Sequence, residues 1–303
     1  MSVVLGIDGG GTRTRAAIAD GDRVIAQVEG GSIKRLRVGA EAAEQNLRLL
    51  LKDVYAKAGN VKVGAATVGV ASATMPGVKE WITAVFHEIG IAKVEVVGDE
   101  VIALDAAFRG GAGILQIAGT GSNTIGRAAD GRRVSAGGWS SRLGDEGSGY
   151  WIGLHSLRRA LAAHDHEQPT GVLDAVGRIW GTSTIDELVN IGDGTPGPDF
   201  AALAPTINAL AESGDSVAVD VLKQAGHDLV NFVLLVRTKM RNQFNLSDEV
   251  PVAWTGSVVD KMRIVREVFF AGLAQAAPLM PVGTEETRSI EGAVWRAHRL
   301  AGN

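Results

Sequence analysis

Short apolar runs alternate with longer stretches that carry an apolar residue every three or four positions in the first third of the chain. A bounded apolar run predicts a strand, and the longer spacing predicts an amphipathic helix. Strands are therefore predicted over residues 3–8, 14–19, 61–70 and 94–97, with another after Asp20-Gly21, and helices over residues 41–58 and 78–89. The run over residues 61–70 is apolar on both faces, which is typical of a central strand in a covered sheet.

The start of this pattern returns further along the chain. Residues 7–14 align without a gap on residues 117–124, and an Asp-Gly turn follows at the same distance in both copies. Each copy predicts three strands joined by a glycine turn and an Asp-Gly hairpin turn. A repeat at this spacing indicates two duplicated domains rather than a solenoid, whose units are shorter. The first copy continues helix, strand, helix, strand, helix, which is the order of a ribonuclease-H-like α/β domain with a mixed sheet.

Both glycine turns have the composition of a phosphate site. Gly9, Gly10 and Gly11 lack a Cβ atom, so their amides can converge on an anion, and Thr12 adds a hydroxyl. The second turn repeats small and hydroxyl residues at Gly119, Thr120, Gly121 and Ser122. Either turn alone is consistent with an ordinary hairpin, but two in register favour the binding of one polyphosphate from two sides.

Two carboxylates follow predicted strands. Asp8 lies beside the first glycine turn, where a hard oxygen ligand suits Mg²⁺, whereas the second copy has Ala118 at the aligned position. Asp99 follows the strand over residues 94–97, and open α/β sheets bind ligands at the carboxyl ends of their strands. A carboxylate there can accept a proton from a substrate hydroxyl during phosphoryl transfer. The alternative is that Asp99 only caps the next helix. Asp105, on that helix, is interpreted as a surface or helix–helix residue.

A glycine-rich loop follows the second hairpin. Gly138 and Asp145 stand among small residues before a helix expected from about Ser148. This backbone and this carboxylate could hydrogen-bond a polyhydroxylated ligand. A purely structural turn followed by a helix cap explains the pattern equally well.

Composition narrows the classes of function. The chain has 303 residues, of which 46% are hydrophobic and 21% charged, as in an ordinary globular protein with room for two domains. A net charge of −4 argues against nucleic acid as the main partner. Cysteine is absent, which excludes disulfides, thiolate nucleophiles and cysteine-bound iron–sulfur clusters. Because neither a signal segment nor an apolar run near the roughly 20 residues of a spanning helix is present, we expect a cytoplasmic protein without membrane contact.

Four glycine-containing motifs stand in order at residues 6–12, 119–123, 137–139 and 143–148. Together they resemble the BadF/BadG/BcrA/BcrD ATPase family, and more narrowly its N-acetylglucosamine kinase branch within the actin, Hsp70 and sugar kinase fold. The resemblance covers nearly the whole chain. It implies two ribonuclease-H-like domains with a nucleotide and sugar cleft between them. The first domain would comprise residues 1–110 with 285–303, and the second residues 111–284.

The resemblance also implies an enzyme that transfers the γ-phosphate of ATP, with Mg²⁺ at Asp8, to the 6-hydroxyl of N-acetylglucosamine or N-acetylmuramic acid. Asp99 matches the catalytic aspartate of the family, and Asp145 matches its sugar-binding aspartate. Gly138 and Trp139 match the loop beside the sugar. The phosphate and adenosine segments are matched by Gly9, Gly10, Gly11, Thr12, Thr120, Gly121, Ser122, Asn123, Gly256 and Ser257.

The family tends toward homodimers, so a homodimer is expected. Apolar positions over residues 217–236 could serve its interface, and core packing explains them equally well.

One departure from the family pattern bears on the sugar. Lys34 stands in the loop after the first hairpin, where N-acetylglucosamine kinases tend to carry Asn in a Ser-x-Asn pattern. With Arg35 and Arg37 it could bind an acidic group, such as the lactyl carboxylate of N-acetylmuramic acid, and it would disfavour protonated glucosamine. The alternative is that these cations form a solvated loop. Ser72 is a further candidate for the sugar pocket.

Three other functions compete with this one. An activator ATPase of the same family would need cysteines for a shared [4Fe–4S] cluster, and the chain has none. A nucleotide-dependent switch protein would hydrolyse ATP slowly regardless of sugar, whereas Asp99 and the loop with Gly138 and Asp145 favour a small-molecule acceptor. A kinase of glucosamine or of another hexose stays open.

Overall fold

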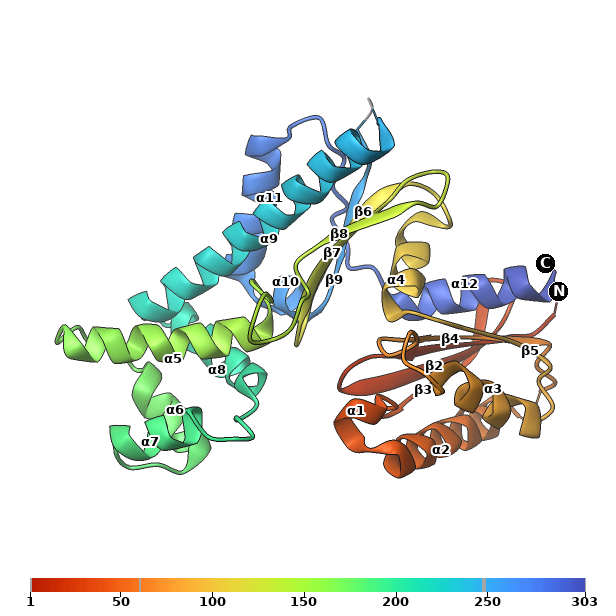
Figure 1. Cartoon of the computed structure of the whole chain (residues 1–303), viewed down its shortest axis with the longest axis horizontal. Helices are drawn as coiled ribbons and strands as arrows, with labels where there is room; N and C mark the ends of the chain where they lie inside the picture. Colours follow the sequence, from red (N-terminus) through yellow and green to blue (C-terminus); the bar gives the residue numbers. More distant parts are fainter. Residues whose placement is uncertain (1, 60, 247–248, 303) are drawn as a thin grey trace. The chain divides into compact units, whose positions relative to one another are not determined.

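The computed structural model describes residues 2–59, 61–246 and 249–302. The chain divides into two compact units. Unit 1 comprises Met1–Ala112 and Thr287–Asn303, and unit 2 comprises Gly113–Glu286. Each unit has its own sheet (Figure 1). Each also has its own hydrophobic core.

Unit 1 is built on a five-stranded mixed sheet in the order β3-β2-β1-β4-β5. The strands are β1 Val4–Gly9, β2 Arg13–Asp20, β3 Arg23–Gly31, β4 Ala65–Val70 and β5 Lys93–Val97. β2 pairs antiparallel with both β1 and β3, whereas β1, β4 and β5 run parallel. The carboxyl ends of these three parallel strands therefore meet at one edge of the sheet.

Helices cover both faces of this sheet (Figure 1). On one face α2 Ala40–Ala58 contacts β2 and β3, and α3 Val78–Glu88 contacts β5. On the other face α4 Asp99–Phe108 packs against α12 Ser289–Ala301, which also contacts β1 and β4. This close approach requires glycine, because a Cβ atom at Gly292 would lie 1.8 Å from the carbonyl oxygen of Ile102.

A partly buried ion-pair network holds α12 within unit 1. Arg296 on α12 contacts Asp105 on α4 at 2.6 Å (Nη1 to Oδ2) and Glu95 on β5 at 2.5 Å (Nη2 to Oε1). Since Asp105 is 1% exposed, it serves the contact between helices and not the surface.

The strand predicted over residues 61–70 is wrong at its beginning. β4 starts at Ala65, where its ladder with β1 begins at the pair Val4↔Ala65. Because β1 itself starts at Val4, the residues before Ala65 have no neighbouring strand to pair with. Gly64 still donates its amide to the carbonyl of Val3 at 2.8 Å.

Unit 2 is built on a four-stranded sheet in the order β8-β7-β6-β9. Its strands are β6 Gly113–Ala118, β7 Ser122–Arg127, β8 Arg133–Ala136 and β9 Val252–Thr255. Its helices are α5 Gly149–Asp165, α6 Val172–Trp180, α7 Ile185–Gly192, η1 Phe200–Leu203, α8 Ala204–Glu212, α9 Ser216–Phe244, α10 Ser257–Lys261 and α11 Arg263–Ala276.

The long helix α9 organises the core of unit 2. It lies on β6, β7 and β8, and α5, α8 and α11 contact it. The apolar positions over residues 217–236 are mostly buried in this core, although Leu235 is exposed. Core packing thus accounts for most of the positions that a dimer interface could also explain.

The two hairpins of the sequence repeat do not pair their strands in the same way. In unit 1, Gly9 pairs with Thr14. In unit 2, the residue aligned with Thr14 is Thr124, which pairs with Gln116, and the turn closes earlier at the pair Ala118↔Ser122. Relative to the gapless alignment the register differs by three residues, and an odd shift moves aligned side chains to the opposite face of a sheet. The sequence repeat is therefore not matched by an equivalent register between the first and second strands of the two hairpins.

Candidate active site

The two predicted acidic residues of unit 1 lie at the carboxyl edge of its parallel strands. Asp8 is the residue before the last one of β1, and Asp99 comes directly after β5 as the first residue of α4. The Asp8 side chain is 14% exposed. The negative charge of Asp8 acts on Asp99, so the fold brings the two carboxylates together as expected.

The environment of Asp99 suits a base. Burial raises the pKa of its carboxyl to about 6, helped by the charges of Glu100 and Asp8 and opposed by a hydrogen bond. That bond comes from the amide of Glu100, which donates to Oδ1 at 3.0 Å. At neutral pH the carboxylate is ionised yet basic enough to take a proton from a hydroxyl. The N-cap of α4 is Gly98, so the idea that Asp99 is the capping residue is wrong.

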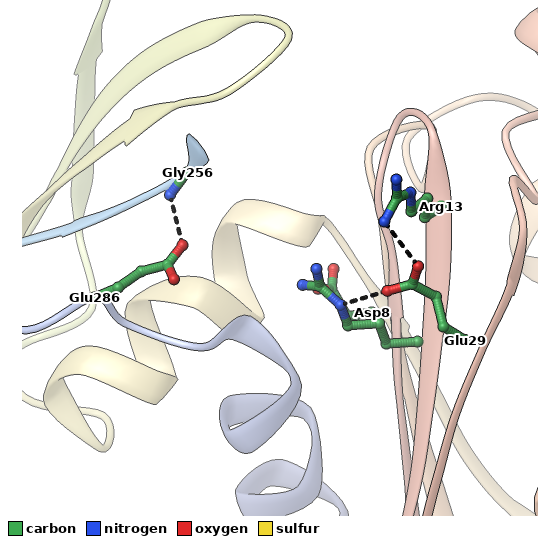
Figure 2. A network of polar contacts seen from close by, with 6 residues as sticks. Asp8, Arg13, Glu29, Gly256 and Glu286 are labelled. Carbon is green, nitrogen blue, oxygen red and sulfur yellow. Dashed lines mark hydrogen bonds and ion pairs between the residues drawn. The ribbon is translucent and has the colours of Figure 1, made fainter. Parts of the chain in front are cut away.

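Asp8 has a basic neighbour that sequence reasoning missed. Burial raises the pKa of Asp8, and the charge of Arg15, whose Nη1 lies 3.9 Å from Oδ2, opposes this shift. Arg15 pairs with Glu29 on β3 at 3.2 Å. Arg13 pairs with the same carboxylate at 3.0 Å (Figure 2). Alternate basic residues on β2 were the available signal, because they share the face of the hairpin on which Asp8 lies.

The first glycine turn offers backbone donors. None of its three glycines has a positive φ, and a Cβ atom on Gly11 would meet nothing within 4 Å. Within residues 2–59, 61–246 and 249–302, no hydrogen bond engages the amides of Gly10, Gly11 or Thr12. The turn is thus an open row of amides, as expected for an anion site.

The loop with the three cations lies beside this turn. Lys34 precedes the short helix α1 Arg35–Val38, and its amide donates to Ser32 Oγ at 3.2 Å. The Arg35 guanidinium stacks over Trp81 at 4.3 Å, so this cation is not part of a solvated loop. Ser72 is 4% exposed, and among the described residues its hydroxyl has no hydrogen-bond partner.

The second glycine turn is held by its neighbours. Gly119 donates its amide to the carbonyl of Gly121 at 2.8 Å. The first amides of α5, from Gly149 and Tyr150, donate to the carbonyls of Gly119 and Thr120. In unit 2 as described, the amides of Thr120 and Gly121 take part in no hydrogen bond, so this turn offers fewer donors than the first.

The predicted sugar loop contacts this second turn. Asp145 is buried and accepts the amide of Ser122 on Oδ1 at 2.6 Å. Burial raises the pKa of Asp145, against the opposing hydrogen bonds of Ser122 and Ser148. Gly138 has φ 68°, and a Cβ atom there would lie 2.9 Å from Cγ of Asn123. Trp139 is 83% exposed, so the loop offers both a buried carboxylate and an exposed aromatic face.

The predicted adenosine segment reaches the same turn. Gly256 has φ 109°, and a Cβ atom there would lie 2.3 Å from the carbonyl oxygen of Ala118. Only glycine fits, and Ser257 then begins α10. The Gly256 amide donates to Oε1 of Glu286 at 3.1 Å, a partner that the sequence did not indicate (Figure 2).

The site residues therefore fall into one group in each unit. Unit 1 holds the first glycine turn with Asp8, Lys34, Ser72 and Asp99, and unit 2 holds the second turn with the sugar loop and the adenosine segment. Among the described residues, no three His, Cys, Asp or Glu side chains are grouped to hold a metal ion. No helix within those residues is long and apolar enough to cross a membrane.

Residues 5–294 match the sequence profile of the BadF/BadG/BcrA/BcrD ATPase family. The chain belongs to this family. The resemblance predicted from the four motifs is confirmed.

Two characterised proteins are similar in sequence to this ATPase family member over most of its length. An N-acetylmuramic acid/N-acetylglucosamine kinase of Clostridium acetobutylicum is 29% identical over 97% of each chain. A glucosamine kinase of Vibrio cholerae is 28% identical over 79% of this chain and 82% of the relative.

Solved structures confirm the fold class of this family member as an actin-like ATPase. A candidate N-acetylglucosamine kinase from Chromobacterium violaceum is similar with a TM-score of 0.71 at 28% identity, over 99% of both chains. A ROK family glucokinase from Streptomyces griseus, solved with glucose and AMPPNP, has a TM-score of 0.61 over 99% of this chain and 100% of its own. Its 16% identity supports the fold alone.

Proposed function

We propose that this chain is an ATP-dependent kinase that phosphorylates the 6-hydroxyl of an N-acetylhexosamine, with N-acetylglucosamine and N-acetylmuramic acid as the candidate sugars. Membership of the ATPase family and similarity to the kinase of Clostridium acetobutylicum support the substrates. The observation that carries the proposal is the position of Asp99 beside Asp8 at the carboxyl edge of the sheet of unit 1, where partial burial and neighbouring charges raise its pKa to about 6.

The proposed reaction assigns a separate task to each group of residues. Asp99 accepts the proton of the sugar 6-hydroxyl while the oxygen of that hydroxyl forms a bond to the γ-phosphorus. At the same time the bond between the γ-phosphorus and the β,γ-bridging oxygen breaks, which releases ADP. The open amides of Gly10, Gly11 and Thr12 donate to phosphate oxygens. Such fixed donors need no reorganisation during the reaction, which favours transfer.

Asp8 fits the magnesium ion that such a reaction uses. Mg²⁺ keeps several waters and is held by one or two carboxylates with substrate phosphates, so a single buried carboxylate is sufficient. The pKa of Asp8 is raised by burial, and a bound cation would favour the ionised form. When bound, Mg²⁺ supplies charge neutralisation of the phosphates.

Lys34 is the proposed determinant of the sugar. It stands at the start of α1 where related kinases tend to carry Asn, and its ammonium would favour a sugar with a carboxylate. The similar protein of Clostridium acetobutylicum is an N-acetylmuramic acid/N-acetylglucosamine kinase, which agrees with this choice. The similarity to a glucosamine kinase keeps glucosamine as a second candidate, which the positive charge of Lys34 opposes.

A coupled assay of ADP release tests the proposal. The panel contains N-acetylglucosamine, N-acetylmuramic acid, glucosamine, N-acetylmannosamine and glucose, and we expect release that depends on an N-acetylhexosamine. The variant Lys34→Asn restores the family pattern and should move the preference toward N-acetylglucosamine. ADP release that is the same with and without every sugar would refute the kinase.

We also propose that the protein is a homodimer and that it is located in the cytoplasm. Light scattering tests the first of these proposals, and cell fractionation tests the second.

A further inference from the structure

A half-buried arginine stands next to Lys34. Arg35 is the first residue of α1, and its guanidinium lies over the indole of Trp81 on α3, with Cζ 4.3 Å from the centre of the ring. Contact with an aromatic face stabilises a guanidinium and limits the motion of its long side chain. The cation is therefore held in place by a neutral neighbour and not by a carboxylate.

The charge of Arg35 is unpaired within the described part of the chain. Its side chain makes no hydrogen bond or ion pair with any residue there, and its Nε–H is buried without an acceptor. Glu44, which touches the same indole, accepts the Nε1 hydrogen of Trp81 at 3.2 Å and pairs with Arg48 at 2.9 Å. Because a buried N–H without a partner costs stability, this arrangement is better explained by a ligand than by the needs of the fold.

The loop that carries this arginine is built against the first glycine turn. Ile33 is buried next to Gly9, since a Cβ atom on Gly9 would lie 2.9 Å from Cδ1 of Ile33. Ser32 donates its hydroxyl to the carbonyl of Gly11 at 3.0 Å and accepts the amide of Lys34 on Oγ at 3.2 Å. These contacts place the start of α1 beside the proposed phosphate site.

Lys34 and Arg35 differ in what they can bind. An ammonium is a compact, strongly hydrated charge on a flexible stem, and no described contact fixes the side chain of Lys34. A guanidinium is planar and can donate two parallel hydrogen bonds to a carboxylate. Since the indole already orders Arg35, less conformational entropy is lost when it binds a ligand. Arg35 is therefore better suited to a direct pair with a carboxylate.

We propose that Arg35 binds the lactyl carboxylate of N-acetylmuramic acid through its terminal guanidinium nitrogens, an inference that rests on the proposed function. Trp81 is then a positioning residue, which holds the guanidinium ready for the sugar. Lys34 adds positive potential around the same group. The carboxylate of the sugar supplies the counter-charge that Arg35 lacks within the described part of the chain.

Calorimetric titration of the full chain with N-acetylmuramic acid, its methyl ester and N-acetylglucosamine tests this role. The ester keeps nearly the size of the acid but has no charge, so the unmodified chain should bind the acid more tightly. Arg35→Gln should weaken the binding of the acid roughly 10-fold or more, because a charge-assisted pair is lost. It should leave the affinities for the ester and for N-acetylglucosamine unchanged. Arg35→Lys keeps the charge without the planar fork, and its affinity for the acid should fall between the two.

Three further variants test the stack and the specificity of the effect. Trp81→Leu removes the aromatic face and should weaken the binding of the acid by a smaller factor, whereas Trp81→Phe should restore most of the affinity. Neither should change the affinity for N-acetylglucosamine. Arg23→Gln, an exposed arginine at the start of β3, is the matched control and should bind all three sugars normally.

Two outcomes would overturn the inference: normal affinity of Arg35→Gln for the acid, or an equal loss of affinity for all three sugars. The kinase proposal fails separately. An unmodified chain that binds the acid through Arg35 but releases no ADP with any sugar keeps this inference and refutes the kinase. A chain that phosphorylates N-acetylglucosamine but binds the acid and its ester equally well does the reverse.

Discussion

The two glycine turns differ in what their neighbours do to them. In unit 1 the amides of Gly10 and Gly11 are unused by any described contact, and two partly buried carboxylates lie at the same edge of the sheet. In unit 2 the carboxylate of Asp145 and the first amides of α5 take up much of the hydrogen-bonding capacity of the turn. One sequence pattern thus gives an open reactive edge in one unit and a held scaffold in the other.

The comparison also shows what a repeat can conceal. Aligned residues of the second strands point to opposite faces because the two hairpins differ in register by three residues. Asp8 shares its face with Arg15, whereas the residue aligned with Arg15 is Ile125 and pairs with Leu115. The proposed chemistry of unit 1 therefore depends on charged residues that the second copy lacks, in addition to the glycines that both copies share.

The substitution with the largest expected effect removes the proposed base of unit 1. Asp99→Asn keeps the shape of the side chain but cannot accept the proton, so turnover should fall by roughly 10²-fold or more while the KM for sugar stays nearly constant. Steady-state kinetics with the preferred sugar measure this, with Asp20→Asn, at the exposed end of β2, as the matched control. Near-normal turnover of Asp99→Asn would remove Asp99 from the mechanism.

The second test removes one acidic residue from each unit. Asp145→Ala leaves the buried amide of Ser122 without its partner and should cost about 1–3 kcal/mol of stability. Asp8→Ala removes a carboxyl whose burial disfavours its charge, and no described amide of the first turn depends on it, so a smaller loss or a gain is expected. Scanning calorimetry without ligands compares the two melting temperatures. Equal losses would mean that the turns do not differ in the way described.

The smallest test concerns the pH at which the base ionises. The rate at limiting substrate should rise with pH through about 6, since the pKa of Asp99 is raised to about 6 and only the ionised form accepts a proton. Glu100→Gln removes a charge that contributes to this shift, so the rise should move to lower pH by a fraction of a unit. Glu80→Gln, on the exposed side of α3, should leave the profile unchanged. A profile of Glu100→Gln identical to that of the unmodified chain would contradict the assigned cause.

Short-range signals made most of the fold predictable. Asp-Gly turns between apolar runs predicted both hairpins, and apolar spacing predicted α2 and α3 closely. The beginning of β4 was not predictable from its own residues, because the strand starts only where it has a neighbouring strand to pair with. The register of the second hairpin could not be predicted from the sequence repeat either, because it depends on which residues of β6 and β7 pair.

The candidate site was predictable only in part. Asp8 and Asp99 could be expected together from the parallel strands that carry them. Glu29 and Glu286 could not, because their contacts join residues 14 to 30 positions apart and depend on how loops and strands meet in space.

The packing of α12 against α4 has a consequence for the synthesis of the chain. The surface around Ile102 that receives Gly292 is synthesised before unit 2, whereas α12 is synthesised after it. Making residues 113–286 in between takes about 10–35 s at typical rates of translation. During that time unit 1 lacks the helix that covers one face of its sheet. We therefore expect unit 1 to complete its core only after the residues of unit 2 have been made, although most of its own residues are made first.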